Sequence, residues 1–227
     1  MPLSSPLTTS TPKVAVVTGG TGALGAAVAR RFAAAEYDVH VTTSREPEPP
    51  GYAGSGRAHV VDLSKLEAVR AFAQKFAYVN ALVLSAGGFA EARLDALTSH
   101  DIEAMLEINV KTAAYALAAF GEKLARGAGV VLIGSQSYAG AAGMAPYAAS
   151  KAAVVSLMQS AALEWKPRGV RVNAVLPDIM DTPANRRAMP MADVNHWARP
   201  EDVAEAILWL CSSAAKLVSG NAIKVGV

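Results

Sequence analysis

Short runs of apolar, β-branched residues alternate along this chain with longer stretches of helix-forming residues. A short apolar run that ends abruptly at turn residues is typical of a strand buried on both faces of a parallel sheet. On this basis strands are predicted at 13–18, 38–43, 59–62, 81–85, 129–133, 171–176 and 222–225. The pattern predicts a single doubly wound α/β domain with a seven-stranded, mostly parallel sheet and helices on both faces.

Helices are predicted between these strands. Ser64 is expected to N-cap the helix after the third strand, with Glu67 three residues later completing a capping box. One long helical region is predicted over 98–125, and further helices over about 146–165 and 200–213. Proline suits the first helical turn, where its missing N–H is unused, and position 146 is a proline.

A glycine-rich turn lies between the first predicted strand and the helix that follows it. Gly20, Gly22 and Gly25 match the pattern Gly-x-Gly-x-x-Gly. In this position the N–H groups and dipole of a helix N-terminus attract phosphate, and absent Cβ atoms allow close approach. The motif predicts a Rossmann-type dinucleotide site. The candidate cofactor-binding residues of the turn are Gly19, Thr21, Gly22, Ala23, Leu24 and Gly25.

The residues after the second and third strands bear on which dinucleotide is bound. Ser44 and Arg45 stand where a site selective for NAD usually offers a carboxylate to the ribose. Arg45 can pair instead with a 2′-phosphate, which a carboxylate would repel. The sequence therefore favours NADP(H), and NAD(H) stays open because Glu46 is adjacent. Asp62 is either an acceptor for an adenine amino group or an ordinary acid at the start of a helix.

Ligands of open α/β sheets bind at the carboxyl ends of the strands. Small residues follow the fourth strand, Ser135 follows the fifth, and a loop over 177–183 follows the sixth. Asn109 interrupts a helical region, where asparagine is unfavourable. It lies at a kink, bonds a partner or is merely tolerated there, and the sequence leaves these three alternatives open. Further candidate cofactor-binding residues at the strand ends are Leu63, Ser85, Ala86, Gly87, Pro177, Met180 and Thr182.

Tyr147 and Lys151 are four residues apart, which places both side chains on one face of a helix. A phenol titrates near pH ~10, and a neighbouring ammonium favours the phenolate and lowers that value. The pair is predicted to be a proton donor or acceptor.

Together these motifs resemble the short-chain dehydrogenase/reductase family over nearly all of residues 13–227. The run from Thr18 to Gly25 is similar to the family's Thr-Gly-x-x-x-Gly-x-Gly, with Ala23 at the middle glycine. The resemblance implies a catalytic tetrad of Asn109, Ser135, Tyr147 and Lys151, and it places Tyr147 and Lys151 beside the cofactor as well.

Two details of the resemblance stay open. The family commonly spaces its serine one residue further from the tyrosine than Ser135 lies from Tyr147, so Ser137 competes with Ser135. The stretches 22–25, 86–89, 174–177 and those between 181 and 193 resemble dihydropteridine reductases within the family. Ser44-Arg45 and Ser135 depart from that enzyme, which leaves an ordinary carbonyl substrate as the alternative to a pterin.

The family resemblance implies hydride transfer between a nicotinamide and a carbonyl or imine carbon. Tyr147 would give the proton, Ser135 would hold the substrate oxygen, and Lys151 would bind the nicotinamide ribose. Asn109 would hold a water that links Lys151 to solvent. A homodimer or homotetramer is implied. The rival interpretation is a non-catalytic nucleotide-binding regulator on the same fold.

Composition agrees with one enzyme domain. The chain has 227 residues, of which 52% are hydrophobic, and a formal net charge of +2 without a basic run. It therefore lacks the signature of a nucleic-acid-binding surface, and no apolar run approaches bilayer-spanning length. Cys211, the single cysteine, suits a reducing, cytoplasmic location. No metal site is predicted. Residues 1–12 are expected to be a disordered lead-in to one domain over 13–227.

Overall fold

The structure is a computed structural model that describes residues 12–44 and 56–226. Its sheet has seven strands in the order β3-β2-β1-β4-β5-β6-β7, and every neighbouring pair is parallel. The strands are β1 (Lys13–Thr18), β2 (Tyr37–Thr43), β3 (Arg57–Val60), β4 (Val79–Leu84), β5 (Leu124–Ile133), β6 (Arg171–Pro177) and β7 (Ala222–Val225). The chain builds outward from β1 to β3 and then crosses to β4, so the strand order reverses between β1 and β4.

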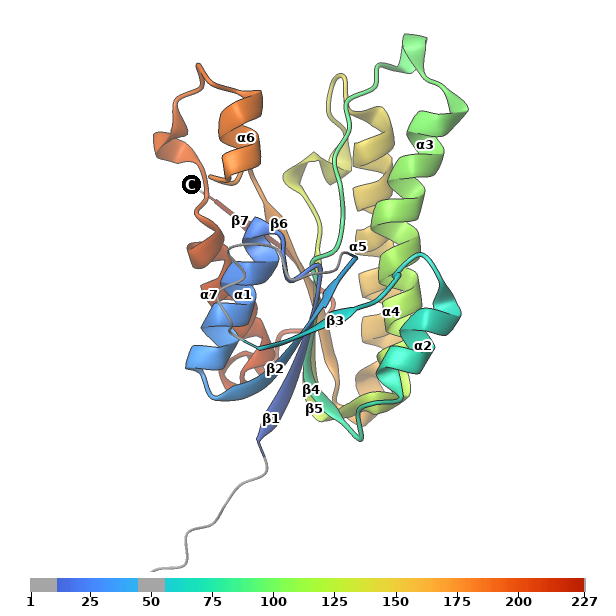
Figure 1. Ribbon diagram of the computed structural model, residues 1–227, viewed down its shortest axis with the longest axis vertical. Helices are drawn as coiled ribbons and strands as arrows, with labels where there is room; N and C mark the ends of the chain where they lie inside the picture. The colour runs from blue at the N-terminus through green and yellow to red at the C-terminus, as the bar shows by residue number, and fades with distance from the viewer. Residues whose placement is uncertain (1–11, 45–55, 227) are drawn as a thin grey trace, which may run out of the picture.

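Helices cover both faces of the sheet (Figure 1). On one face α1 (Ala23–Ala34) and α7 (Pro200–Cys211) enclose a core that includes Phe32 and Ile207. On the other, α2 (Leu66–Ala73), α4 (Thr112–Phe120) and α5 (Ala145–Trp165) enclose a second core around Phe120 and Met158. All seven residues of β6 are buried because both faces are covered. The predicted fold class is confirmed.

Shorter helical pieces lie mainly at the ends of these elements. They include α3 (Ser99–Met105), α6 (Pro183–Ala188), a π-helical segment (Leu106–Lys111) and 3-10 turns at Leu94–Ala96, Gly121–Lys123, Gln136–Ala139, Lys166–Arg168, Val194–His196 and Ser213–Ala215. The π-helical segment joins α3 to α4, and α6 follows β6 at the carboxyl end of the sheet (Figure 1).

Two local predictions were wrong. The helical region expected over 98–125 ends earlier, because β5 already begins at Leu124, which pairs with Val79 of β4. Ser64 does not cap α2: the N-cap is Lys65, which makes no capping hydrogen bond with its side chain. The Ser64 hydroxyl donates instead to Asp62 at 2.6 Å, a local bond that serine forms readily outside helices.

The described part of the chain holds no helix long and apolar enough to cross a bilayer. The expected disordered lead-in falls almost wholly outside the described residues. Arg45 and Glu46, on which the choice between NADP(H) and NAD(H) rests, lie outside them as well.

Candidate active site

In the glycine turn between β1 and α1, the backbone packs closely against itself and against the backbone of Ala86. Gly19 has φ +65°, and a Cβ on it would lie 2.8 Å from the Cα of Ala86. A Cβ on Gly25 would lie 2.3 Å from the carbonyl oxygen of Gly19. The lack of a Cβ at Gly19 and Gly25 lets the backbone pack this closely. The helix α1 then begins at Ala23 and has no acidic residue in its first turn. The positive end of its dipole is therefore left available for an anion.

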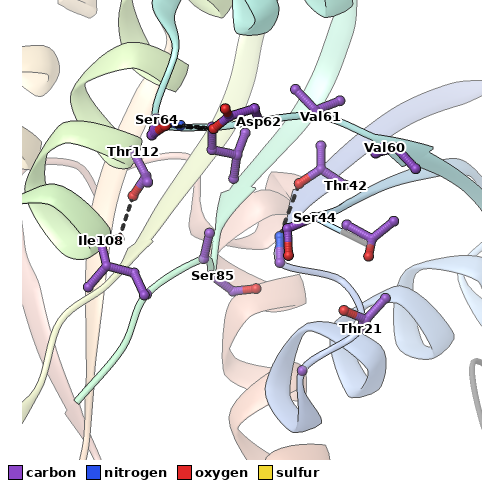
Figure 2. Close-up of a pocket in the computed structure, with 16 residues that line it drawn as sticks. Thr21, Thr42, Ser44, Val60, Val61, Asp62, Ser64, Ser85, Ile108 and Thr112 are labelled. Atoms are coloured by element: carbon purple, nitrogen blue, oxygen red, sulfur yellow. Dashed lines mark hydrogen bonds between the residues drawn. The ribbon is translucent and has the colours of Figure 1, made fainter. Parts of the chain in front are cut away.

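A cavity of about 520 Å³ opens at this turn, along the carboxyl ends of β1, β2, β3 and β4 (Figure 2). The Gly19 N–H donates to Thr42 Oγ1 at 3.2 Å, which fixes the turn against β2. The predicted cofactor-binding residues that line the cavity are Gly19, Thr21, Gly22, Ser44, Asp62, Leu63, Ser85, Ala86 and Gly87. A groove of this size, walled by glycine backbone and hydroxyls, fits the adenosine and phosphate portion of a dinucleotide.

Asp62 lines this cavity and also pairs with Lys65, the N-cap residue of α2. Its Oδ1 accepts from the N–H of Ser64 at 3.0 Å and from the Ser64 hydroxyl (Figure 2). Lys65 lies 3.2 Å from its Oδ2. The hydrogen bonds from Ser64 come first among the causes that lower the pKa of Asp62, so this wall of the cavity carries a carboxylate at neutral pH.

A second cavity, of about 250 Å³, adjoins the first and shares Ser85 and Gly87 with it. Ser135, Tyr147 and Lys151 all line it. Ser135 comes from the turn after β5, and the other two come from the first turns of α5. Leu24, Pro177 and Met180, predicted as cofactor contacts, line it too.

Tyr147 is mostly buried, and burial is the main cause that raises the pKa of its phenol above 10. A hydrogen bond with the Ser135 side chain lowers the pKa by less. The expectation that the phenol is shifted downward by Lys151 was therefore wrong for the protein without ligand. The Lys151 Nζ lies 5.7 Å from the centroid of the Tyr147 ring and donates its hydrogen bond to the carbonyl oxygen of Ile133. Burial disfavours the charged phenolate and so raises the pKa.

Lys151 is a buried ammonium whose Nζ donates to the carbonyl oxygen of Ile133 at 3.0 Å. Desolvation lowers its pKa to about 8. The amine is therefore close to the point at which it gives up its proton in mildly alkaline solution.

Asn109 lies in the π-helical segment and is 1% exposed. Its Oδ1 accepts from the N–H of Gly88 at 3.0 Å, and its Nδ2 donates to the Gly88 carbonyl at 3.0 Å. The same Nδ2 donates to Ser150 Oγ at 3.1 Å. Of the possibilities the sequence left open, the structure supports a bonded partner, and Asn109 lies in a π-helical segment. Asn109 thus connects the loop that follows β4, through Gly88, to α5, through Ser150.

A family model described as "short chain dehydrogenase" matches residues 13–193. The chain belongs to the short-chain dehydrogenase family. Its relatives include 3beta-hydroxysteroid dehydrogenase 1 of Eggerthella lenta, 33% identical over 94% of this chain and 92% of that protein. The cyclic-di-GMP-binding biofilm dispersal mediator protein of Escherichia coli is 30% identical, and the match covers 92% of this chain and 94% of that protein.

The fold is also similar to that of solved structures over most of the chain. The blue fluorescent protein from a metagenomic library, in complex with NADPH, has a TM-score of 0.82 and 28% identity over 94% of this chain and 96% of its own.

Within this short-chain dehydrogenase, geometry distinguishes Ser135 from its competitor. Ser135 is 9% exposed, lines the smaller cavity together with Tyr147, and lowers the pKa of the Tyr147 phenol. Ser137 is not among the residues that line that cavity, and its N–H donates to Ser135 Oγ at 3.2 Å. Ser137 thus orients Ser135.

Some predicted contacts line neither cavity. Thr182 is buried and caps α6, where its Oγ1 accepts from the N–H of Asn185 at 3.2 Å. Ala23 and Gly25 belong to the first turn of α1 and act through packing. Arg45 lies outside the described residues.

Other lining residues were not predicted. Thr42, Thr43, Val60 and Val61 lie at strand ends, so the rule applied to Ser44 and Asp62 would have found them. Ile108 and Thr112 also line the larger cavity (Figure 2), but they come from the π-helical segment and α4. No local signal marks them, because packing of the helices brings them there.

Proposed function

We propose that this protein is an NADP(H)-preferring oxidoreductase that transfers hydride to or from the carbon of a small carbonyl or alcohol. The supporting observation is that Ser135, Tyr147 and Lys151 line one cavity, which shares Ser85 and Gly87 with the groove at the glycine turn. A substrate bound beside Tyr147 would thus meet the end of a cofactor lying along that groove.

The residues present fit a dinucleotide. The crowded glycine turn would hold its phosphates, and Ser85, Ala86 and Gly87 would line its path toward the smaller cavity. When bound, the nicotinamide supplies or accepts the hydride, and the protein supplies orientation and proton transfer. We further propose that Thr182, Pro177 and Met180 flank the nicotinamide end, as the family resemblance implies.

The four polar residues then have separate roles. Tyr147, whose raised pKa keeps the phenol neutral at pH 7, donates the proton when a carbonyl is reduced. Ser135 holds the substrate oxygen. Lys151, protonated in most molecules at pH 7, binds the ribose and assists proton return to Tyr147. Asn109 fixes the Gly88 loop and, by family resemblance, a water near Lys151.

The preference for NADP(H) rests on Arg45 in the sequence and is supported by a relative solved with NADPH. The pterin-like imine substrate suggested by the resemblance to dihydropteridine reductases is a narrower form of the same proposal. We also propose that residues 13–227 act as one catalytic domain in a cytoplasmic homodimer or homotetramer.

A turnover screen tests the proposal. Oxidation of NADPH is followed with aldehydes, ketones, quinones and quinonoid dihydropterin, and the reverse reaction with alcohols. Tyr147→Phe should lower turnover about 10²–10⁴-fold, since it removes the general acid, and should leave NADPH binding intact. Full activity in this variant would refute the role of Tyr147. Tight nucleotide binding with no turnover on any substrate would support the regulatory alternative instead.

A further inference from the structure

A cavity of about 380 Å³ lies at the amino-terminal end of the sheet, opposite the candidate active site. Its lining includes Lys13 and Arg171, the first residues of β1 and β6. In Figure 1 the start of β1 lies at the end of the sheet away from α6. No aspartate or glutamate is among its lining residues. Four cationic side chains line it: Lys13, Arg126, Arg171 and Lys216. We call it the basic cavity.

The charge of the basic cavity is not balanced within the described residues. None of the ion pairs there includes any of the four cations. Residues 1–12, which precede Lys13 in the sequence, contain no acidic residue. The whole chain has a formal net charge of only +2, so the remainder of the molecule is on balance negative. Positive charge is therefore concentrated at this site.

Arg171 is the buried member of the set, at 7% exposed. Its guanidinium donates to the carbonyl oxygens of Leu210, Cys211 (3.1 Å) and Ala215 (3.2 Å), at the end of α7 and just beyond it. These carbonyls satisfy its hydrogen bonds and partly offset its charge, but none is an anion. Arg171 thus contributes a fixed positive field to the floor of the cavity.

Lys13, Arg126 and Lys216 are exposed, so their head groups are accessible from solvent. Ser212 and Ser213 add hydroxyls to the wall. A cleft lined by one sign of charge and backed by buried protein concentrates the field and attracts counter-ions. Arginine forks and lysine ammonium groups bind phosphate oxygens through charge-assisted hydrogen bonds.

We propose that the basic cavity binds a small phosphorylated molecule with at least two negative charges, of the diphosphate type. Its volume lies within the range of small-molecule sites and is smaller than the groove at the glycine turn. A recess suits a small anion better than a nucleic acid, which needs basic residues along an extended face. The proposal is independent of the catalytic roles, because the cavity shares no residue with either active-site cavity.

Calorimetric titration with inorganic pyrophosphate at low ionic strength tests the proposal. We expect one site per chain, with affinity that falls as salt is added. In the double variant Arg126→Ala/Lys216→Ala binding should weaken at least about tenfold, because each change removes a charge-assisted contact. Both side chains are exposed, so the fold should tolerate the changes, and a thermal unfolding scan checks this.

The control is Arg93→Ala/Lys224→Ala, which removes one arginine and one lysine from exposed positions that do not line the cavity. It should leave pyrophosphate affinity within about twofold of the parent, since long-range charge effects are screened by salt. Equal weakening in both double variants would overturn the site in favour of general charge attraction. Loss of the pyrophosphate signal when NADPH is present would place the anion at the glycine turn and overturn it too. If the first double variant unfolds, Lys13→Ala alone should still weaken binding.

Discussion

Asn109 and Gly88 hold each other through two reciprocal hydrogen bonds, each 3.0 Å long. The amide of one buried side chain thereby satisfies both polar groups of a loop residue. That loop carries Gly87, and a Cβ there would lie 2.6 Å from Asn109 Oδ1 and 3.4 Å from Lys151 Nζ. Asn109 and Lys151 therefore both approach Gly87, which lines both cavities of the candidate active site.

Asn109→Ala should destabilise the protein by roughly 2–4 kcal/mol, because it leaves the N–H and carbonyl of Gly88 without their partner. Unfolding in urea measures the loss. Ser150→Ala is the matched control, since it removes one partner of Asn109 and leaves the contact with Gly88 in place. If the two variants lose equal stability, the contact with Gly88 is not what Asn109 contributes.

Ser135→Ala should lower kcat/KM by roughly 10²-fold, a typical cost for removing a donor to the reacting oxygen. Ser137→Ala should lower it much less, because Ser137 contacts Ser135 through its backbone N–H, which alanine retains. Steady-state kinetics on a substrate from the screen decides between them. The reverse order of effects would make Ser137 the catalytic serine.

Lys151→Met should stabilise the ligand-free protein at pH 7 while removing activity. Folding lowers the Lys151 pKa from 10.5 to about 8, so the unfolded chain binds more protons between these values. Stability of the parent therefore rises as pH rises from 8 to 10.5. At pH 7 the shift corresponds to a destabilisation of the folded parent by about 3 kcal/mol. The variant regains this free energy but loses about 1 kcal/mol with the hydrogen bond to Ile133, so its net gain is the difference between the two.

Urea unfolding of parent and Lys151→Met at pH 7 and pH 10 measures this difference, which should shrink at the higher pH. Lys111→Met, at an exposed lysine paired with Glu107, should show no comparable gain. A variant less stable than the parent at both pH values would contradict the assignment of Lys151 as a buried, destabilising ammonium.

His40 and His59 form a pair on β2 and β3, with Nδ1 of the first 2.9 Å from Nε2 of the second. Burial is the main cause that lowers the pKa of each ring; Asp38 opposes it at His40, while His40, Lys75 and Arg57 add to it at His59. The unfolded chain binds more protons below pH ~6.5, so stability should fall as pH falls through that value.

His59→Asn should reduce this acid sensitivity, measured as the difference in unfolding free energy between pH 7 and pH 5. His196→Asn, outside the pair, is the control. An unchanged pH dependence in His59→Asn would show that the pair does not titrate on unfolding.

Arg45→Asp should reverse coenzyme preference, lowering the ratio of NADPH to NADH efficiency at least tenfold, because a carboxylate repels the 2′-phosphate. Glu46→Gln is the control for the adjacent charge. An unchanged ratio in Arg45→Asp would show that Arg45 does not contact the cofactor.

The sequence alone determined those features that depend on neighbours along the chain. The strand bounds of β1 and β7 were predicted as observed, since a buried parallel strand is a local apolar run. The Tyr147–Lys151 spacing and the glycine turn also follow from local geometry: one helical turn in the first case, and backbone without Cβ in the second.

Only the tertiary structure decided what depends on distant neighbours. Gly88, the partner of Asn109, is 21 residues away in the chain, and the spacing of apolar residues along the helix does not predict this contact. The pKa of Tyr147 moves upward because packing around the cavity removes water, which disfavours the charged phenolate. The basic cavity arises because parallel strands bring their amino ends to one edge of the sheet, where Lys13, Arg126 and Arg171 meet although over a hundred residues separate the first from the others.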